Sequence, residues 1–336
     1  MKRQVVLASV VLTGALVTVV ATAAQQAPPA GAPAAQGQGR GDGRGRGDGQ
    51  GRGGGRAGGG FGAVGMIEKV TDTVYMIPGA GGNSGVMVAA NGVVLVDTKL
   101  ANNGQAILDQ IKTVTDKPIT HIINTHTHGD HTGSNMFFPA TVEVVTHENT
   151  ATNMAKEGAN PNFNTPENKH GLPDRTFKDR LTVLAGNDSI DLYYFGPSHT
   201  NGDTIVVFRN ARVAHTGDMF ANKGNGLIDR NNGGSGLEWG ATIGKAAAGI
   251  KNVDRVITGH STVLPWQDFV DFGEVNRLVA AHARDAVKSG KTAEQALAEF
   301  KLPEKLSAAG FTVTGGGRGG ATGNFGIIFE ELKGSK

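Results

Sequence analysis

Short apolar runs rich in β-branched residues alternate with longer amphipathic stretches from Met66 onward. Short apolar runs between turn residues are typical of buried strands, whereas apolar residues at helical spacing are typical of helices that pack on a sheet. The pattern predicts strands over 74–77, 85–89, 93–97, 119–123, 141–146, 189–195, 204–209, 212–214 and 255–258. It predicts helices over 102–114, 148–156, 236–253 and 266–287.

The alternation of strands and helices indicates one α/β domain over residues 63–310. Within it, Asn91-Gly92 is a strong hairpin signal between two of the predicted strands. The polar, Asn-rich stretch 158–180 is expected to form a surface insertion. The Gly-rich stretch 311–336 is expected to form a C-terminal tail outside the domain.

Residues 1–24 have the layout of a secretory signal peptide, with Lys2 and Arg3, an apolar run and a small-residue exit. An uncleaved membrane anchor is the alternative, because the apolar run approaches the length that spans a bilayer. Residues 25–60 offer almost nothing to bury and are predicted to form a disordered linker. The signal peptide predicts a periplasmic or secreted protein without stable membrane insertion after cleavage.

Cysteine content and charge exclude several classes of function. The chain has no cysteine, which excludes disulfides, thiol nucleophiles and a lipid-modified amino terminus. Residues 1–60 carry seven Lys or Arg and two Asp, a net +5 of the whole-chain +2, so the remainder is −3. A mildly acidic domain has no electrostatic footprint for nucleic acid, and a small-molecule substrate is the expected partner. The oligomeric state stays open.

Four potential metal ligands follow the predicted strand 119–123 within six residues. They are His126, His128, Asp130 and His131. A solvated polar loop would be the alternative, but such loops are usually built from Asn, Ser, Gly and Pro. Neutral imidazole and carboxylate are the expected ligands of zinc and related divalent ions. The cluster therefore predicts a metal site at the end of this strand.

The stretch His126-Thr127-His128-Gly129-Asp130-His131 resembles the His-x-His-x-Asp-His loop of the metallo-β-lactamase-fold superfamily. The resemblance covers about Met66 to Trp266 and continues, in the family's order, through His199, Asp218 and His260. It implies an α/β fold, an αββα sandwich in which two mixed β-sheets are flanked by helices.

The same resemblance implies two metal ions and a ligand set for each. The first ion would be held by His126, His128 and His199, the second by Asp130, His131 and His260, and Asp218 would bridge both. The absence of cysteine makes this set similar to that of glyoxalase II-type hydrolases. Oxygen-reducing diiron relatives place Glu where this chain has His128, which favours two Zn²⁺, with other divalent ions left open. Asp97 and His215 are expected to hydrogen-bond the ligands.

Two divalent ions that share a bound water lower its pKa and polarise the carbonyl that it attacks. The resemblance therefore predicts hydrolysis of an ester, thioester, lactone or amide, with β-lactams among the candidates. Asp130 is expected to be catalytic, because it would orient the attacking hydroxide as well as bind metal. A mononuclear iron oxygenase of the same fold and a non-catalytic zinc-binding protein are the alternatives.

The residues that line the pocket determine the substrate, and the sequence identifies them less clearly than it identifies the metal ligands. The segment 219–236 follows Asp218 and is expected to overhang the site, with Lys223, Asn225 and Asn232 as candidate substrate contacts. Lys223 would grip a substrate carboxylate or be an ordinary exposed lysine. The loop 79–84 is expected to be either the opposite flap or a flexible turn.

Overall fold

The computed structural model of the protein describes residues 62–156, 158–159, 161–315 and 320–334. The predicted signal peptide 1–24 and linker 25–60 lie outside the described residues. The described chain belongs to one compact unit, Gly58–Lys336. Among the described residues, no helix is both long enough and apolar enough to cross a bilayer.

The first half of this unit forms a mixed sheet whose spatial order follows the chain order. It starts as antiparallel strands and becomes parallel from the fourth strand onward, because helical connections return the chain to the same end. The strands are β1 (Glu68–Lys69), β2 (Val74–Ile77), β3 (Ser84–Ala89), β4 (Gly92–Val96), β5 (Ile119–Ile123), β6 (Glu143–His147) and β7 (Arg175–Phe177).

The second half forms another mixed sheet, with spatial order β13-β12-β11-β10-β9-β8. Only β11 and β12 pair in parallel in this sheet. Its strands are β8 (Arg180–Val183), β9 (Ile190–Tyr193), β10 (Ile205–Phe208), β11 (Val213–His215), β12 (Arg255–Ile257) and β13 (Val263–Pro265).

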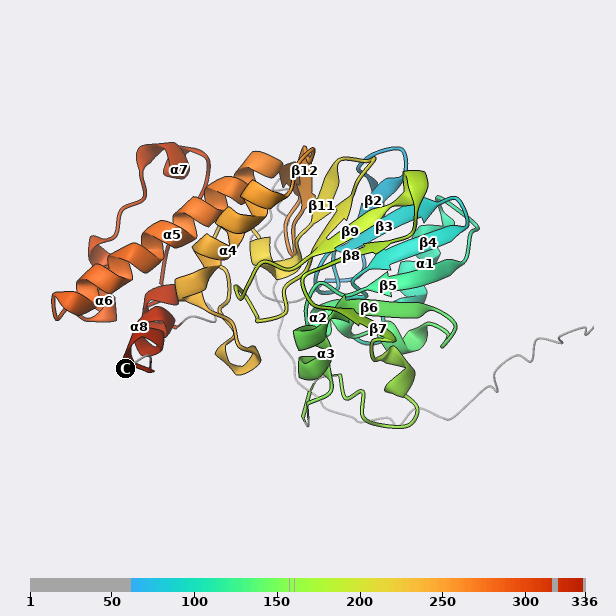
Figure 1. Ribbon diagram of the computed structural model, residues 1–336, viewed down its shortest axis with the longest axis horizontal. Helices are drawn as coiled ribbons and strands as arrows, with labels where there is room; N and C mark the ends of the chain where they lie inside the picture. The colour runs from blue at the N-terminus through green and yellow to red at the C-terminus, as the bar shows by residue number, and fades with distance from the viewer. Residues whose placement is uncertain (1–61, 157, 160, 316–319, 335–336) are drawn as a thin grey trace, which may run out of the picture. The chain divides into compact units, whose positions relative to one another are not determined.

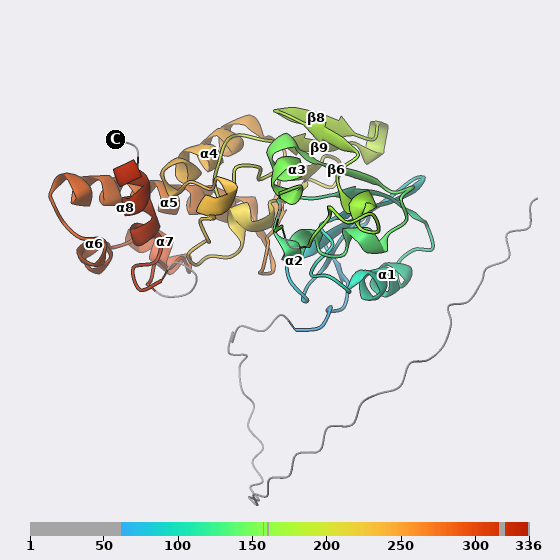
Figure 2. The ribbon, with the colours of Figure 1, turned by 90° about the horizontal axis from the view of Figure 1, so that it is seen from below.

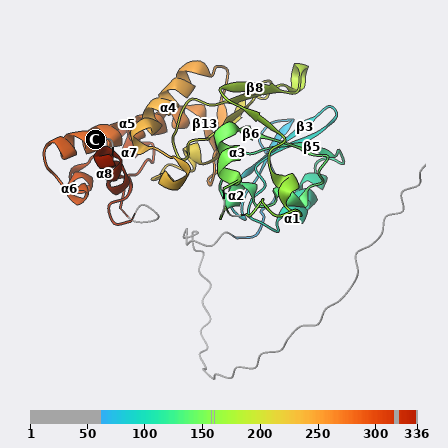
Figure 3. The same cartoon turned by 60° about the horizontal axis from the view of Figure 1, so that its bottom comes forward.

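Apolar side chains from both sheets meet in one cluster between them, including Val94 and Ile123 from the first sheet and Val206 and Phe208 from the second. Helices lie over the outer face of the first sheet and over part of the outer face of the second (Figure 1), whereas β8 stands at the edge of the molecule with no helix of the described chain over it in Figures 2 and 3. The helices are α1 (Gly104–Lys112), α2 (Gly129–Thr132), α3 (Glu148–Met154), α4 (Gly236–Gly249), α5 (Trp266–Lys288), α6 (Ala293–Glu299), α7 (Glu304–Ala308) and α8 (Asn324–Gly334).

Helix α1 packs Ile107 and Ile111 against the first sheet, and α4 and α5 pack on the second sheet through a separate core that includes Trp239 and Phe269. In Figures 2 and 3 the layers follow one another from β8 through the first sheet to α1. Because the core between the sheets covers one face of the first sheet and α1 packs on the other, β4 is buried along its whole length. The predicted αββα sandwich with two mixed β-sheets is confirmed.

Two expectations from the sequence differ from the structure. The stretch 158–180 is not only a surface insertion, because it buries Phe163 and contributes β7 to the edge of the first sheet. The Gly-rich stretch 311–336 is not a separate tail, because α8 buries Phe325 and Ile328 in the same core as α4 and α5. In both stretches a few apolar residues, which stand between Gly and Asn residues in the sequence, pack against residues that are distant in the chain.

Candidate metal centre

The candidate ligands all follow the carboxyl ends of strands, at the edge where the two sheets meet. His126 and His128 lie on the loop after β5, and Asp130 and His131 lie on α2. The other three come from the second sheet, which is why a folded chain is needed to assemble the site. They are His199 after β9, Asp218 after β11 and His260 after β12.

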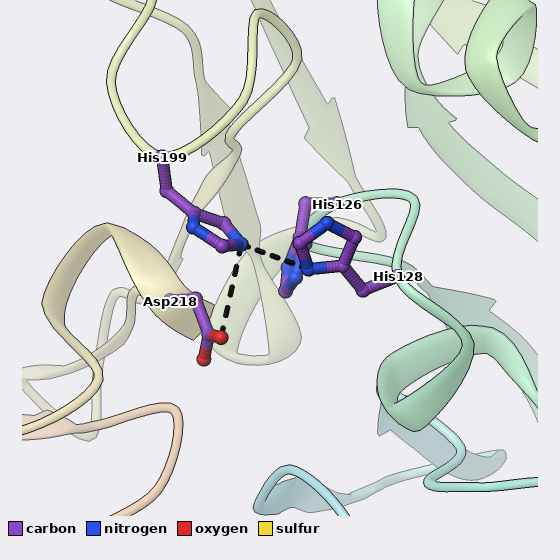
Figure 4. Close-up of side chains that lie close together, drawn as sticks. All are labelled: His126, His128, His199 and Asp218. Carbon is purple, nitrogen blue, oxygen red and sulfur yellow. Dashed lines mark hydrogen bonds and ion pairs between the residues drawn. The ribbon is translucent and has the colours of Figure 1, made fainter. Parts of the chain in front are cut away.

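A first group consists of His126, His128, His199 and Asp218, whose candidate ligand atoms lie within 4.8 Å of one another. Figure 4 shows these four side chains converging from both sheets. Nε2 of His199 lies 3.0 Å from Nδ1 of His128 and 3.7 Å from Oδ2 of Asp218. His126 and His199 are fully buried. This spacing suits side chains that share one ion.

A second group consists of Asp130, His131 and His260. The two imidazole Nε2 atoms lie 3.4 Å apart, and Oδ2 of Asp130 lies 3.3 Å from Nε2 of His260. Asp218 reaches this group with its other oxygen, because Oδ1 lies 3.4 Å from His131 and 3.2 Å from His260. The structure therefore places Asp218 between both groups.

Asp97 fixes the orientation of two ligands from the end of β4. Its Oδ2 accepts hydrogen bonds from Nδ1 of His131, at 2.7 Å, and from the Thr125 hydroxyl, at 2.7 Å. Because the Thr125 hydroxyl donates its proton to Asp97, it must accept a hydrogen bond from Nδ1 of His126, which lies 3.0 Å away. In the neutral form that binds metal, both histidines therefore carry their proton on Nδ1 and leave Nε2 free.

The other two histidines of the first group are oriented by the segment that follows Asp218. Nε2 of His128 donates to Oδ2 of Asp229 at 2.6 Å, which leaves Nδ1 as the free nitrogen. Nδ1 of His199 donates to the carbonyl of Leu227 at 2.7 Å, which leaves Nε2 free. Sequence analysis did not single out Asp229 or Leu227 for these contacts, since both lie far from their partners in the chain.

These tautomers make the group a good fit for a metal ion. The free nitrogens of His128 and His199 face each other at 3.0 Å, although neither carries a proton to share. Among the described residues, Nε2 of His126 is buried without a hydrogen-bond partner, whereas Oδ1 of Asp218 has the imidazoles of His131 and His260 as neighbours. Buried acceptors without donors are costly, and a cation between them removes that cost.

The electrostatics differ between the two groups, because the nearby carboxylates raise the pKa of His131 and His260 against their burial, whereas burial prevails in the first group. Burial lowers the pKa of His126 and of His199, which keeps both imidazoles neutral, as metal ligands must be. Burial also acts most strongly on His260, but the carboxylates of Asp218 and Asp130 overcome it and raise the pKa of His260 to about 9. Asp130 is ionised at neutral pH, because His260 and His131 outweigh its burial and hold its pKa at about 2.

Glycines let the backbone approach the ligands. A Cβ at Gly82 would lie 2.1 Å from the ring of His131, and a Cβ at Gly259 would lie 2.0 Å from Oδ1 of Asp218. The loop of Gly82 is anchored by Lys99, a buried side chain whose ammonium donates to the carbonyls of Ile77, Gly79 and Gly82 at 2.7 to 2.9 Å. The loop 79–84 is therefore a fixed wall of the site, pinned against α2.

The remaining predicted residues lie at different distances from the centre. His215 donates to the carbonyl of Asn83 and accepts from the backbone of Gly217, so its hydrogen bonds go to the backbone and not, as expected, to a ligand. Lys223 pairs with Asp268 at 2.9 Å and donates to the carbonyl of Ala309. Asn225 bonds the backbone of Thr314. Asn232 lies nearer, because it donates to Asp229 at 2.7 Å. The roles of Lys223, Asn225 and Asn232 as substrate contacts stay predictions.

Fold and site together define a sandwich that carries two adjoining His and Asp groups at one edge of its sheets. The family model of the metallo-beta-lactamase superfamily matches residues 77–306, and the chain belongs to this superfamily. The predicted family and the prediction of an enzyme of this superfamily are thereby confirmed.

Several known proteins are similar to this chain. Metallo-beta-lactamase type 2 of Elizabethkingia meningoseptica is 24% identical over 60% of this chain and 80% of the relative. The alpha subunit of 2,4-dinitroanisole O-demethylase from Nocardioides sp. (strain JS1661) is 32% identical over 30% of this chain. The structure of the stereoselective inverting sec-alkylsulfatase Pisa1 from Pseudomonas sp. aligns with 81% of this chain at 15% identity and a TM-score of 0.68.

The similarity covers only part of two of these proteins. It spans 29% of the demethylase subunit and 51% of the alkylsulfatase. The names of the three proteins refer to three different bonds, so membership of the superfamily defines the type of centre and leaves the substrate to be argued from this chain.

Proposed function

We propose that this protein is a binuclear zinc hydrolase that cleaves a small ester, thioester, lactone or amide. The observation that carries the proposal is the first group, in which the free nitrogens of His126, His128 and His199 converge beside Asp218 without a proton to share. His126, His128 and His199 would hold one ion, Asp130, His131 and His260 the other, and Asp218 both. When bound, two such ions activate a water for attack and polarise the bond that is broken.

The residues of the chain supply the orientation that this chemistry needs. Asp130 is ionised and its side chain is 13% exposed, so it can accept a hydrogen bond from an attacking water and align it. Asp97 is fully buried and holds His131 and, through Thr125, His126. Because these contacts exist before the substrate arrives, little reorganisation is needed during the reaction.

Space for a small substrate is present beside the second group. A cavity of about 350 Å³ is lined by His260, Ser261, Asn83 and the backbone of Gly79 to Gly81. Its size is at the lower end of the range for small-molecule sites. Its lining residues Gly79 to Gly81 belong to the loop that Lys99 anchors, which favours a cavity of defined shape.

Sulfate esters are a second candidate class. The alkylsulfatase aligns with 81% of this chain, and a sulfate ester can be hydrolysed by the same activated water. A substrate panel should therefore contain a β-lactam, a lactone, a thioester, a carboxylic ester, an alkyl sulfate and an aryl methyl ether. The last compound represents the bond type in the name of the demethylase relative.

Metal analysis and this panel test the proposal together. We expect two equivalents of zinc per chain and hydrolysis that disappears on chelation and returns with Zn²⁺. His126→Ala and Asp218→Ala should lower both metal content and turnover, whereas His282→Ala, whose imidazole bonds the carbonyl of Ala296, should change neither. One iron per chain with oxygen consumption would instead support an oxygenase. Full zinc occupancy without turnover on any substrate would support a binding protein.

We also propose that the protein is exported to the periplasm or secreted, on the basis of residues 1–24. Cell fractionation and amino-terminal sequencing of the mature protein test this. A mature chain that begins after residue 24 supports cleavage, and an intact amino terminus in the membrane fraction supports an anchor.

A further inference from the structure

Two loops from different sheets meet beside the second group of candidate ligands. The loop 79–84 joins β2 to β3 in the first sheet. The loop 258–262 joins β12 to β13 in the second sheet and carries His260. Asn83, in the first of these loops, is only 3% exposed. A polar side chain that is buried in a loop needs hydrogen-bond partners, and Asn83 has them in the other loop.

Asn83 makes three hydrogen bonds to the loop 258–262. Its Nδ2 donates to the carbonyl of Thr258 at 2.9 Å and to the carbonyl of Ser261 at 2.6 Å. Its backbone N–H donates to the carbonyl of Gly259 at 2.7 Å. The side-chain amide of Asn has two N–H donors, so both are used and the orientation of the amide group is fixed. These bonds hold the loop on both sides of its metal ligand.

The residue before Asn83 contacts the other two ligands of the second group. The backbone N–H of Gly82 donates to the carbonyl of Asp130 at 2.9 Å. Gly82 lies so close to His131 that a Cβ there would be 2.1 Å from the imidazole ring. The carbonyl of Gly82 accepts from the ammonium of Lys99 at 2.9 Å, which fixes the peptide that leads to Asn83. Gly82 and Asn83 therefore connect the parts of the chain that carry all three ligands.

His260 is the ligand of this group that depends most on support from its backbone. Its side chain is 24% exposed, whereas the side chains of His131 and Asp130 are 0% and 13% exposed. The backbone N–H of His260 donates to the carbonyl of Ala221 at 2.9 Å, which anchors it within the second half of the fold. The other two ligands lie on α2, which follows a strand of the first sheet. The hydrogen bonds of Asn83 cross this boundary between the two halves.

We propose that Asn83 is a positioning residue for the second metal ion, because it sets the distance between His260 and the two ligands on α2. This inference rests on the proposed function for the presence of two ions, but the hydrogen bonds that carry it exist in the metal-free chain. Two imidazoles of the first group are oriented instead by Asp229 and Leu227. Loss of the Asn83 amide should therefore affect the second ion and spare the first.

Zinc affinity, measured by competition with a chromogenic chelator, tests this selectivity. In Asn83→Ala we expect the second ion to bind about tenfold more weakly and the first ion to bind as in the wild type. The milder Asn83→Ser keeps one hydroxyl donor and should show a smaller loss, and it provides the same test if Asn83→Ala does not fold.

Asn276→Ala is the matched control for these variants. Asn276 is also buried, and its Nδ2 donates to a backbone carbonyl, that of Phe272 on α5, at 2.9 Å. Asn276→Ala should lower the stability of the protein, because a buried hydrogen bond is lost, and keep both zinc affinities. The comparison separates the position of a ligand from general loss of stability.

Amide hydrogen exchange in the metal-free full chain separates this inference from the proposed function. The amides of Gly259 and His260 should exchange about tenfold faster in Asn83→Ala than in the wild type or in Asn276→Ala, because their loop loses its link to the first sheet. If this and the selective zinc loss hold but no substrate is hydrolysed with Zn²⁺, the hydrolase proposal fails and the role of Asn83 stands. Unchanged exchange, or equal affinity changes at both ions, refutes the role whatever the turnover. A wild-type protein that binds only one ion would overturn both proposals.

Discussion

Oδ2 of Asp229 lies 2.6 Å from Nε2 of His128, although 101 residues separate the two in the chain. This contact decides which nitrogen of His128 is free for a metal ion, because the nitrogen that donates to the carboxylate cannot also bind metal. Asp229 is itself held by the backbone of Asn231 and Asn232. It is therefore a fixed partner and not a passing contact.

Asp229→Ala should weaken zinc binding at the first ion by about 10- to 100-fold, because His128 loses the acceptor that sets its tautomer and ring orientation. Competition with a chromogenic chelator measures this affinity. Asp285→Ala is a suitable control, since Asp285 is exposed on α5 and pairs weakly with Lys288 at 3.9 Å. Equal affinities for the two variants would contradict the role given to Asp229.

Gly82→Ala should displace His131 and deplete the second ion selectively, since the new Cβ would lie 2.1 Å from the imidazole ring. Zinc content per chain should fall from two equivalents towards one. Gly244→Ala makes the same chemical change at an exposed position of α4 where nothing lies within 4 Å. It should keep both ions and raise stability by up to about 1 kcal/mol, because Ala favours a helix interior over Gly. Full zinc content in Gly82→Ala would show that the loop can move.

His215 should make the protein less stable as the pH falls. Burial lowers the pKa of His215 from 6.5 to about 4, so between these values the unfolded chain binds a proton that the folded chain excludes. The contribution is absent above pH 6.5, grows as the pH falls and approaches about 3 kcal/mol near pH 4.

Denaturant unfolding of the metal-free wild type and of His215→Gln, compared at each pH, measures this effect, since other titrating groups are common to both. The free energy of unfolding of the wild type should fall more steeply between pH 6.5 and 4. Parallel pH profiles would refute the assignment.

Glu331 lies on α8, in the stretch that the sequence predicted to be a tail, and it should stabilise the protein. Its buried carboxylate accepts from the hydroxyl of Ser235 and from the backbone of Gly236 at 3.1 Å, at the start of α4. Glu331→Ala should lower the free energy of unfolding by about 1 to 3 kcal/mol, because it leaves buried donors unpaired. The neighbouring Glu330→Ala removes only an exposed pair with Lys333 and should change stability by less than about 1 kcal/mol. Similar losses in both variants would contradict this.

The apolar pattern predicted the buried strands well and the edges poorly. Strands β2 and β5 have the bounds that the sequence predicted, because a short apolar run between turn residues has few other solutions. Strands β7 and β8 were missed, since they are short, contain Arg and owe their place to backbone pairing with β6 and β9. Helix α6 was missed although the capping box of Thr292 and Gln295 was a readable signal.

In the candidate site too, the sequence predicted what is local in the chain and missed contacts between distant residues. The ligands near His126 are local in sequence, and a family resemblance supplied the others in order. The partners of these ligands depend on which loops meet after folding, and nothing near His128 or His199 in the sequence points to Asp229 or Leu227.

The ligands of each candidate ion come from both sheets, so zinc concentration should set how strongly the two halves of the fold hold together. An ion that binds only the assembled site adds a free energy that grows with the logarithm of its concentration, about 2.7 kcal/mol at one hundred times its Kd. At lower concentrations of the ion, burial of the histidines and carboxylates that face one another between the sheets lowers the free energy of unfolding. The melting temperature of this protein should therefore rise with the concentration of the metal ion that fills the site.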